Sequence, residues 1–127
     1  MRFLSDEWIT AVAFPSVDAV EGGFEGVALV AVTGGPDGEV RFRVTFEGGR
    51  PVQSSPGGDG DWTVSLTIAH GDARALLDGS ADLNVLFMSG RMKVAGEATG
   101  PLLEMLKASK RPDLRDAVAT LAAATDR

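Results

Sequence analysis

The sequence predicts an α+β domain, built on a twisted, mainly antiparallel sheet that short helices cover. Two segments, Glu39–Glu47 and Asp61–Ala69, alternate apolar and polar residues with the period of two that strands with one buried face show. Helical spacing of apolar residues appears near the C-terminus, for example at Leu114 and Val118. The chain has 127 residues without a linker or a repeat, so we expect residues 1–127 to form a single domain.

The N-terminal region predicts one helix and one loop. Ser5 is a suitable N-cap for a helix over Ser5–Phe14, two acidic residues follow in the first turn, and Pro15 ends the pattern. The next segment, Ser16–Gly26, contains several glycines. These glycines precede a strand, whereas a phosphate-binding loop follows a strand and opens a helix, so we interpret the segment as a plain loop.

Two strands joined by a tight turn come next. Gly26–Thr33 is almost entirely aliphatic, which is typical of a strand that is covered on both faces. Gly34–Gly38 combines glycine, proline and aspartate, the residues that favour turns, and predicts a hairpin. The returning strand, Glu39–Glu47, directs four apolar side chains to one face: Val40, Phe42, Val44 and Phe46.

The polar stretch Val52–Gly60 is interpreted as a hairpin loop. Its neighbouring aspartates suggest a calcium loop, but an EF-hand needs a glutamate at its twelfth position, and counting from Asp59 that position is His70. The strand Asp61–Ala69 is then expected to pair antiparallel with Glu39–Glu47. Its apolar face carries Trp62, Val64, Leu66 and Ile68.

Two short helices and a further strand follow. Ala73–Asp78 forms the first helix. Asp82 is a suitable N-cap for the second, which is expected to end at Gly90, where a left-handed C-cap favours a residue without Cβ. The segment Arg91–Gly96 alternates again, with Met92 on its apolar side, and should join the same sheet.

The C-terminal quarter predicts two more helices. The first, Ala98–Ser109, tolerates its proline because Pro101 lies in the first turn. The second begins at Pro112. The apolar face of the first contains Leu102, Leu103 and Leu106.

Composition excludes several classes of function. A net charge of −6 argues against nucleic acid as a partner and against electrostatic docking on anionic lipid headgroups. No cysteine is present, so disulfides and thiolate chemistry are excluded. The longest aliphatic run, Val27–Val32, is far too short for a membrane-spanning helix, and the N-terminus lacks the apolar region of a signal peptide. We therefore expect a cytoplasmic protein without an integral membrane segment.

Catalytic chemistry finds little support in the sequence. The chain has one histidine and no tyrosine. His70 lies where a strand meets a helix and is interpreted as a structural or surface residue, and no second histidine is present to build a zinc site. No serine lies in a Gly-x-Ser-x-Gly nucleophile elbow. The sequence thus predicts neither a catalytic residue, nor a metal, nor a cofactor, and the protein is not expected to be an enzyme.

A block in the second half of the chain carries a family resemblance. Leu77–Gly79 reads Leu-Asp-Gly, and Phe87–Gly96 reads Phe-Met-Ser-Gly-Arg-Met-Lys-Val-Ala-Gly. This order of an apolar helix ending in Phe-Met-x-Gly, a basic residue, Lys-Val-x-Gly and a C-terminal amphipathic helix resembles the sterol carrier protein-2 (sterol-transfer) domain family. The likeness covers about Asp72–Leu106, and the first half of the chain shares only the strand pattern. The resemblance implies a sheet of about five strands under helices, enclosing an apolar cavity that takes a fatty acid, a fatty acyl-CoA or a sterol-like molecule.

The apolar faces and the resemblance together predict a cavity between the sheet and its helical cover. The pattern itself also fits a filled core, in which these residues pack against one another. The predicted function is a non-catalytic carrier of a hydrophobic ligand; the alternatives are an accessory domain whose apolar surface binds a protein partner or forms a homodimer, and a small enzyme for a hydrophobic substrate. The expected lining is Phe42, Val44, Phe46, Trp62, Val64, Leu66 and Met92 from the sheet and Phe87, Leu102, Leu103 and Leu106 from the helices.

Overall fold

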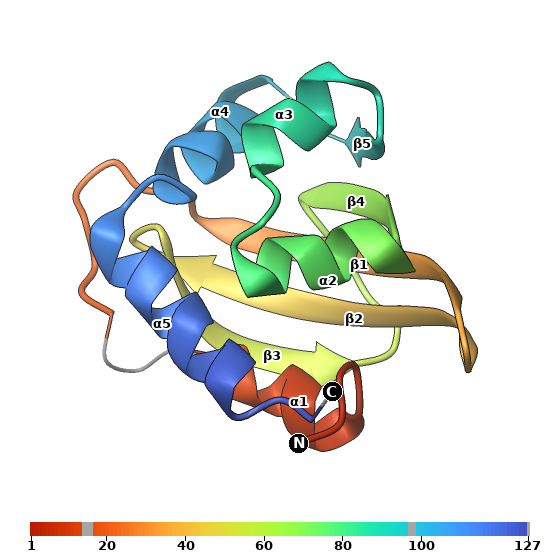
Figure 1. Ribbon diagram of the computed structural model, residues 1–127. Helices are drawn as coiled ribbons and strands as arrows, with labels where there is room; N and C mark the ends of the chain where they lie inside the picture. Colours follow the sequence, from red (N-terminus) through yellow and green to blue (C-terminus); the bar gives the residue numbers. More distant parts are fainter. Residues whose placement is uncertain (14–16, 97–98, 127) are drawn as a thin grey trace.

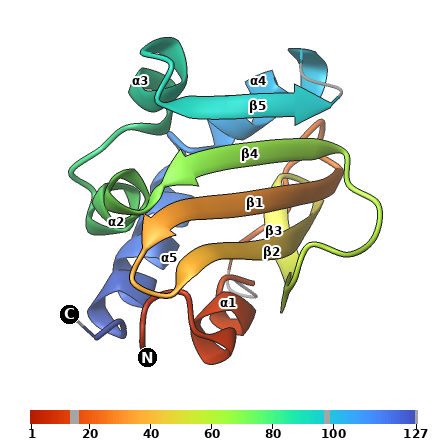
Figure 2. The same ribbon diagram turned by 90° about the vertical axis from the view of Figure 1, so that its right-hand side faces the viewer.

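The computed structural model describes residues 1–13, 17–96 and 99–126 and has the predicted α+β architecture. Five strands form one sheet in the order β3-β2-β1-β4-β5. The described helices gather on one face of this sheet, and none of them covers the opposite face (Figures 1 and 2). The strands are β1 Gly26–Gly35, β2 Gly38–Glu47, β3 Arg50–Pro56, β4 Val64–Ala69 and β5 Met92–Gly96, and the helices are α1 Asp6–Ala11, α2 His70–Asp78, α3 Leu83–Met88, α4 Thr99–Ala108 and α5 Pro112–Ala123.

The sheet is mainly antiparallel, as predicted, with one parallel pair. β1 pairs with β2, β2 with β3, and β4 with β5 in antiparallel fashion. The predicted hairpin at 34–38 is confirmed, because Gly35 and Gly38 are the last partners of β1 and β2. Arg91–Gly96 joins the same sheet as predicted, since β5 pairs with β4.

The expected pairing of Asp61–Ala69 with Glu39–Glu47 is wrong. β1 lies between these two strands and pairs with β4 in parallel. Residues 57–63 connect β3 to β4 across the face without helices, where a Cβ on Gly58 would lie 3.1 Å from the Arg41 side chain. Such a crossover is what a parallel pair requires. As a result, β4 lies on the side of β1 opposite to β2. The alternation of apolar and polar residues within a strand does not indicate which strand it pairs with.

The interpretation of Val52–Gly60 as a loop is also wrong in its first half. Arg50–Pro56 forms β3, which pairs with β2 along the edge of the sheet. The segment lacks apolar alternation and has a proline near each end, at Pro51 and Pro56. Proline removes a backbone donor, which an edge strand tolerates because one of its sides has no partner strand.

The helix ends follow local signals that the sequence already contains. Ser5 caps α1 by accepting from the Trp8 amide at 3.2 Å. The helix ends at Ala11, earlier than the predicted Phe14, which itself lies outside the described residues. The Asp82 carboxylate caps α3 by accepting from the backbone amides of Asn84, at 2.8 Å, and Val85, at 3.3 Å. Gly90 has a φ of +76°, which confirms the left-handed conformation predicted after this helix.

The core lies between the inner face of the sheet and α1, α2, α3 and α5. Trp8 of α1 is buried and donates from Nε1 to the Thr125 hydroxyl at 3.1 Å, which joins the two ends of the chain. The bridge between Arg2 and Asp126 extends this contact, and Figure 1 shows the termini side by side. The largest fully buried side chains are Ile9, Val17, Val32 and Val64.

Candidate ligand-binding site

The sheet residues of the predicted site lie on the face of the sheet that the helices cover, and we call this group the sheet floor. Val64 pairs with Ala28 of β1, which in turn pairs with Val44, so one continuous inner face runs across three strands. Five of the seven predicted sheet residues belong to the buried core cluster, and Phe46 packs against that cluster while partly exposed. The five are Phe42, Val44, Val64, Leu66 and Met92.

The helical residues of the predicted site occupy different environments. Leu106 of α4 is buried, but it stands outside the cluster that contains the sheet floor. Phe87 of α3 is 36% exposed and Leu103 of α4 is 51% exposed. The placement of the Leu102 side chain lies outside the described part of the structure. The sheet floor and Leu106 thus face the interior, whereas Phe87 and Leu103 reach solvent.

Trp62 also lies at the boundary between interior and solvent. It precedes β4 and is 40% exposed. Its ring packs so closely on β5 that a Cβ on Gly96 would lie 2.6 Å from a ring carbon. Gly96 also has a φ of +97°, so both the backbone and the Trp62 contact favour glycine at this position.

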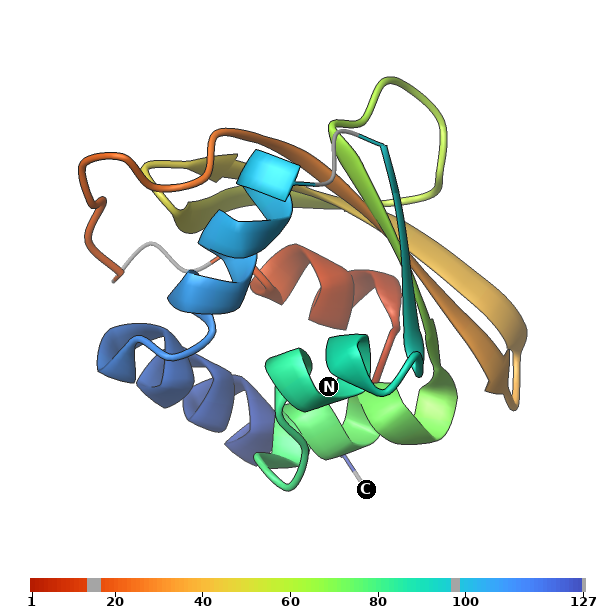
Figure 3. The same cartoon turned by 90° about the horizontal axis from the view of Figure 1, so that it is seen from above.

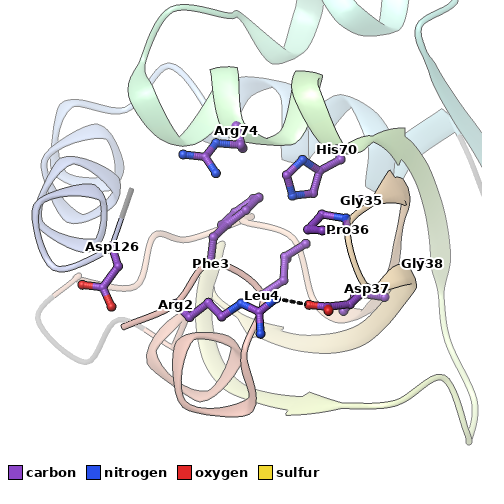
Figure 4. A pocket seen from close by; sticks show the side chains of 11 residues that line it. Arg2, Phe3, Leu4, Gly35, Pro36, Asp37, Gly38, His70, Arg74 and Asp126 are labelled. Carbon is purple, nitrogen blue, oxygen red and sulfur yellow. Dashed lines mark hydrogen bonds and ion pairs between the residues drawn. The ribbon is translucent and has the colours of Figure 1, made fainter.

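The structure contains a pocket of about 250 Å³ at another place, beside the hairpin between β1 and β2 (Figure 4). Phe3 and Val40 contribute apolar side chains to its lining. His70 and Arg74 reach it from α2. The Phe3 and His70 rings are 5.3 Å apart and steeply inclined to one another, and the Arg74 guanidinium lies 5.7 Å from the centre of the Phe3 ring. The full lining is Arg2, Phe3, Leu4, Gly35, Pro36, Asp37, Gly38, Val40, His70, Arg74 and Asp126.

Charges of both signs surround this pocket. Arg2 pairs with Asp37 at 2.5 Å, and Asp126 contributes a second carboxylate. The arrangement suits a small polar group better than a long apolar chain. Of the residues that line this pocket, the sequence singled out only His70, where a strand meets a helix. The pocket forms through contact between the N-terminus and a hairpin that is distant in the sequence, so local patterns do not reveal it. Leu4, which also lines this pocket, has a positive φ of 65°, a conformation that leucine rarely adopts.

One titratable group joins α3 to the end of α4. The Lys110 ammonium hydrogen-bonds to the Asp82 carboxylate, and this bond, with the capped amides of Asn84 and Val85, holds the pKa of Asp82 below its usual range despite some desolvation. Asn84 adds a contact from its Nδ2 to the Ser109 hydroxyl at 3.4 Å. Among the described residues, no group of three or more acidic or histidine side chains is arranged to hold a metal ion.

A sheet whose apolar inner face is covered by short helices defines the class of a two-layer α+β domain. The model of the SCP-2 sterol transfer family matches residues 18–100, well over half of the chain. The protein belongs to this family. It therefore belongs to a family of lipid carriers, whose fold is generally non-catalytic.

Solved structures show the same fold. A conserved hypothetical protein from Thermus thermophilus, described as possibly a sterol carrier protein, matches with a TM-score of 0.76 at 14% identity, covering 95% of this chain and 90% of that one. A sterol carrier protein 2 matches with a TM-score of 0.73 at 14% identity, covering 95% and 97%. Palmitated SCP2L2 from Aedes aegypti matches with a TM-score of 0.63 at 15% identity, covering 83% and 90%. The comparison with curated proteins gives no match.

The length and apolar character of the helices bear on whether one of them could span a membrane. No helix within residues 1–13, 17–96 and 99–126 is both long and apolar enough to cross a membrane.

Proposed function

We propose that the protein is a cytoplasmic, non-catalytic carrier that binds one hydrophobic, lipid-like molecule between the inner face of the sheet and α3 and α4. The observation that carries this proposal is family membership over residues 18–100. The ligand class is a fatty acid, a fatty acyl-CoA or a sterol-like molecule. One structural relative, SCP2L2 from Aedes aegypti, is palmitated.

The environments of the predicted residues support this location. Leu106 is buried at 8% exposure, yet it is separate from the cluster formed by the sheet floor. A side chain that is shielded from water without joining the main core is suited to line a site between the two layers. Phe87 of α3, which is 36% exposed, is the residue that we expect to border the entrance for an apolar chain.

The pocket at Phe3 and Arg74 is a weaker candidate for this ligand. Its volume of about 250 Å³ lies below the roughly 300–1,000 Å³ that is usual for ligand sites. Its lining also includes four charged side chains, Arg2, Asp37, Arg74 and Asp126, whereas a long acyl chain needs a mostly apolar lining. We therefore propose that the lipid binds not in this pocket but between the inner face of the sheet and α3 and α4.

A thermal-shift screen of fatty acids, acyl-CoAs and sterols tests the proposal. A ligand present at about 100 times its Kd stabilises the native state by about 2.7 kcal/mol, which raises Tm by several degrees. Leu106→Trp should place an indole between α4 and the sheet and abolish the shift. Leu103→Trp adds the same side chain at a half-exposed position of the same helix and is the matched control, which should keep the shift.

The outcomes separate the proposal from the alternative of an accessory or dimerisation domain. A wild type that responds to no lipid, and elutes as a dimer in light scattering, would favour that alternative. Circular dichroism of each variant is recorded first, and the smaller Leu106→Phe replaces Leu106→Trp if the latter fails to fold. Equal shifts in the wild type and in a folded Leu106 variant would move the ligand elsewhere.

A further inference from the structure

The pocket beside the β1–β2 hairpin lies apart from the proposed lipid site. The N-terminal segment, the hairpin and the start of α2 form its walls, and Asp126 adds a side chain from the C-terminal end (Figure 4). Figures 1 and 3 show this hairpin and α4 toward opposite ends of the molecule, with α2 between them. What the pocket binds is therefore a separate question from whether a lipid binds under α3 and α4.

Part of the pocket lining is apolar and held firmly in place. The Phe3 ring lies edge-on to the Trp8 ring, with the ring centres 4.9 Å apart. Trp8 is buried in the core, so this contact anchors the Phe3 ring at the edge of the pocket. The apolar residues of the lining are Phe3, Leu4, Pro36 and Val40.

The walls of the pocket also depend on two unusual backbone positions. A Cβ on Gly35 would lie 2.7 Å from Cδ2 of His70, so only glycine lets the hairpin approach the imidazole this closely. Leu4 has a φ of 65°, and a residue with a side chain keeps this conformation only where its surroundings fix it. Strained residues of this kind cluster at binding sites, which directs attention to what the pocket holds.

The charges of the lining leave one cation outside any pair with a lining carboxylate. Asp37 is paired with Arg2 at 2.5 Å, and Asp126 is paired with the terminal ammonium group of Met1 at 3.6 Å. Each carboxylate of the lining therefore has a cation partner of its own. Arg74 belongs to neither pair, and its guanidinium lies 5.7 Å from the centre of the Phe3 ring. The lining thus combines a guanidinium with an aromatic surface.

The start of α2 adds to the positive potential. Ala69, at the N-cap position, has no side chain that could accept a hydrogen bond from the first amides of this nine-residue helix. Such amides and the helix dipole favour a negative charge nearby. Asp72, the acidic residue of the first turn, is paired with Arg91. His70 and Arg74 are one turn apart on the helix, so both side chains can reach the same group.

We propose that this pocket binds a small organic carboxylate with a compact apolar body, such as an aromatic ring. The carboxylate would pair with Arg74 and accept a hydrogen bond from His70, while the ring would contact Phe3 and Val40. Arginine matches the planar geometry of a carboxylate. An apolar cavity of about 150 Å³ holds benzene, so about 250 Å³ is enough for one ring and its carboxylate. Inorganic phosphate would leave the apolar side chains without a partner.

A titration of the ¹⁵N-labelled protein with benzoate tests this site. Saturable shifts are expected for the backbone amide signals of Phe3, Gly35 and Arg74, while the amides of α3 and α4 keep their positions. Benzamide has the same ring without the charge, and acetate has the charge without the ring. Each should bind at least about tenfold more weakly than benzoate, because each lacks one of the two contacts.

Variants separate the role of the guanidinium from that of the fold. Arg74→Gln should weaken the binding of benzoate about tenfold and leave the binding of benzamide unchanged. Arg115→Gln, at an exposed position of α5, is the matched control and should have no effect. Leu106→Trp, the variant designed against the lipid, should bind benzoate as the wild type does. Thermal unfolding of each variant checks that the fold is retained.

Three results would overturn the proposal. The first is a titration with benzoate in which the amides of Phe3, Gly35 and Arg74 show no saturable shift. The second is an equal weakening of benzoate and benzamide binding in Arg74→Gln, which would indicate a change in packing rather than a lost charge. The third is inorganic phosphate that binds as tightly as benzoate, which would show that the apolar side chains contribute nothing.

Discussion

The two ends of the molecule use their apolar residues in different ways. At the end that holds α1 and the chain termini, Trp8 and Ile9 are 6% and 1% exposed, and the Trp8 indole is hydrogen-bonded to Thr125. At the end that holds α3 and α4, Met88 and Leu103 are 84% and 51% exposed. Because a buried side chain stabilises the fold and an exposed one contributes little, Trp8 and Ile9 help to maintain the structure, whereas Met88 and Leu103 do not.

The largest predicted effect is a difference in stability between a substitution at the α1 end and one at the α3–α4 end. Ile9→Ala removes three carbon atoms from a fully buried site and should lower the free energy of unfolding by about 2–5 kcal/mol. Met88→Ala should change it by no more than about 0.5 kcal/mol, because the side chain contacts mostly water. Urea titrations followed by tryptophan fluorescence measure both. A loss below about 1 kcal/mol in Ile9→Ala would contradict tight packing at the α1 end.

A smaller effect concerns the turn from α3 into β5. Gly90 has a φ of +76° and no atom within 4 Å of a Cβ placed on it, so only backbone strain opposes a side chain there. Gly90→Ala should lower stability by about 1–2 kcal/mol, the cost of left-handed backbone for a residue with a Cβ. Gly71→Ala in α2 is the control, because its site is equally open and its φ is not left-handed. That variant should be neutral or stabilising by up to about 1 kcal/mol. Equal effects of the two changes would refute the conformational argument.

The smallest effect should appear in acid. Lys110 holds the pKa of Asp82 below its usual range in the folded protein. A group with a lowered folded pKa contributes stability that is complete above its unfolded pKa, about 3.9, and is lost as the pH falls through the folded value. The wild type should therefore lose more stability than Asp82→Asn as the pH falls below about 4. Acid titrations of the wild type and Asp82→Asn, followed by circular dichroism, measure this difference. Equal losses of stability in the two proteins at low pH would show that the Asp82–Lys110 pair is not maintained in solution.

Local features of the fold were predictable from the sequence, because their causes lie within a few residues. The caps at Ser5 and Asp82 and the left-handed turn at Gly90 each depend on the chemistry of one side chain or its absence. The alternation in Glu39–Glu47 likewise identified a strand and its buried face, and Phe42 and Val44 are buried as that pattern implies.

Long-range features escaped the same reasoning. The parallel pairing of β1 with β4 depends on the crossover of residues 57–63, and β3 is polar because an edge strand needs only backbone partners. Periodicity identified Leu103 and Leu106 as one apolar face, but the structure buries Leu106 and leaves Leu103 half exposed. A helical pattern indicates which residues can be covered, whereas the neighbouring elements decide how far the cover extends.

The most direct test of the proposed carrier function is to identify what the protein holds. Purified protein is extracted with organic solvent and the extract is analysed by mass spectrometry, with Leu106→Trp prepared in parallel. The account predicts a long-chain fatty acid, acyl-CoA or sterol-like molecule at up to one per chain in the wild type, and its loss from the variant. An extract without such a molecule, together with no uptake when these lipids are added at saturating concentration, would contradict it.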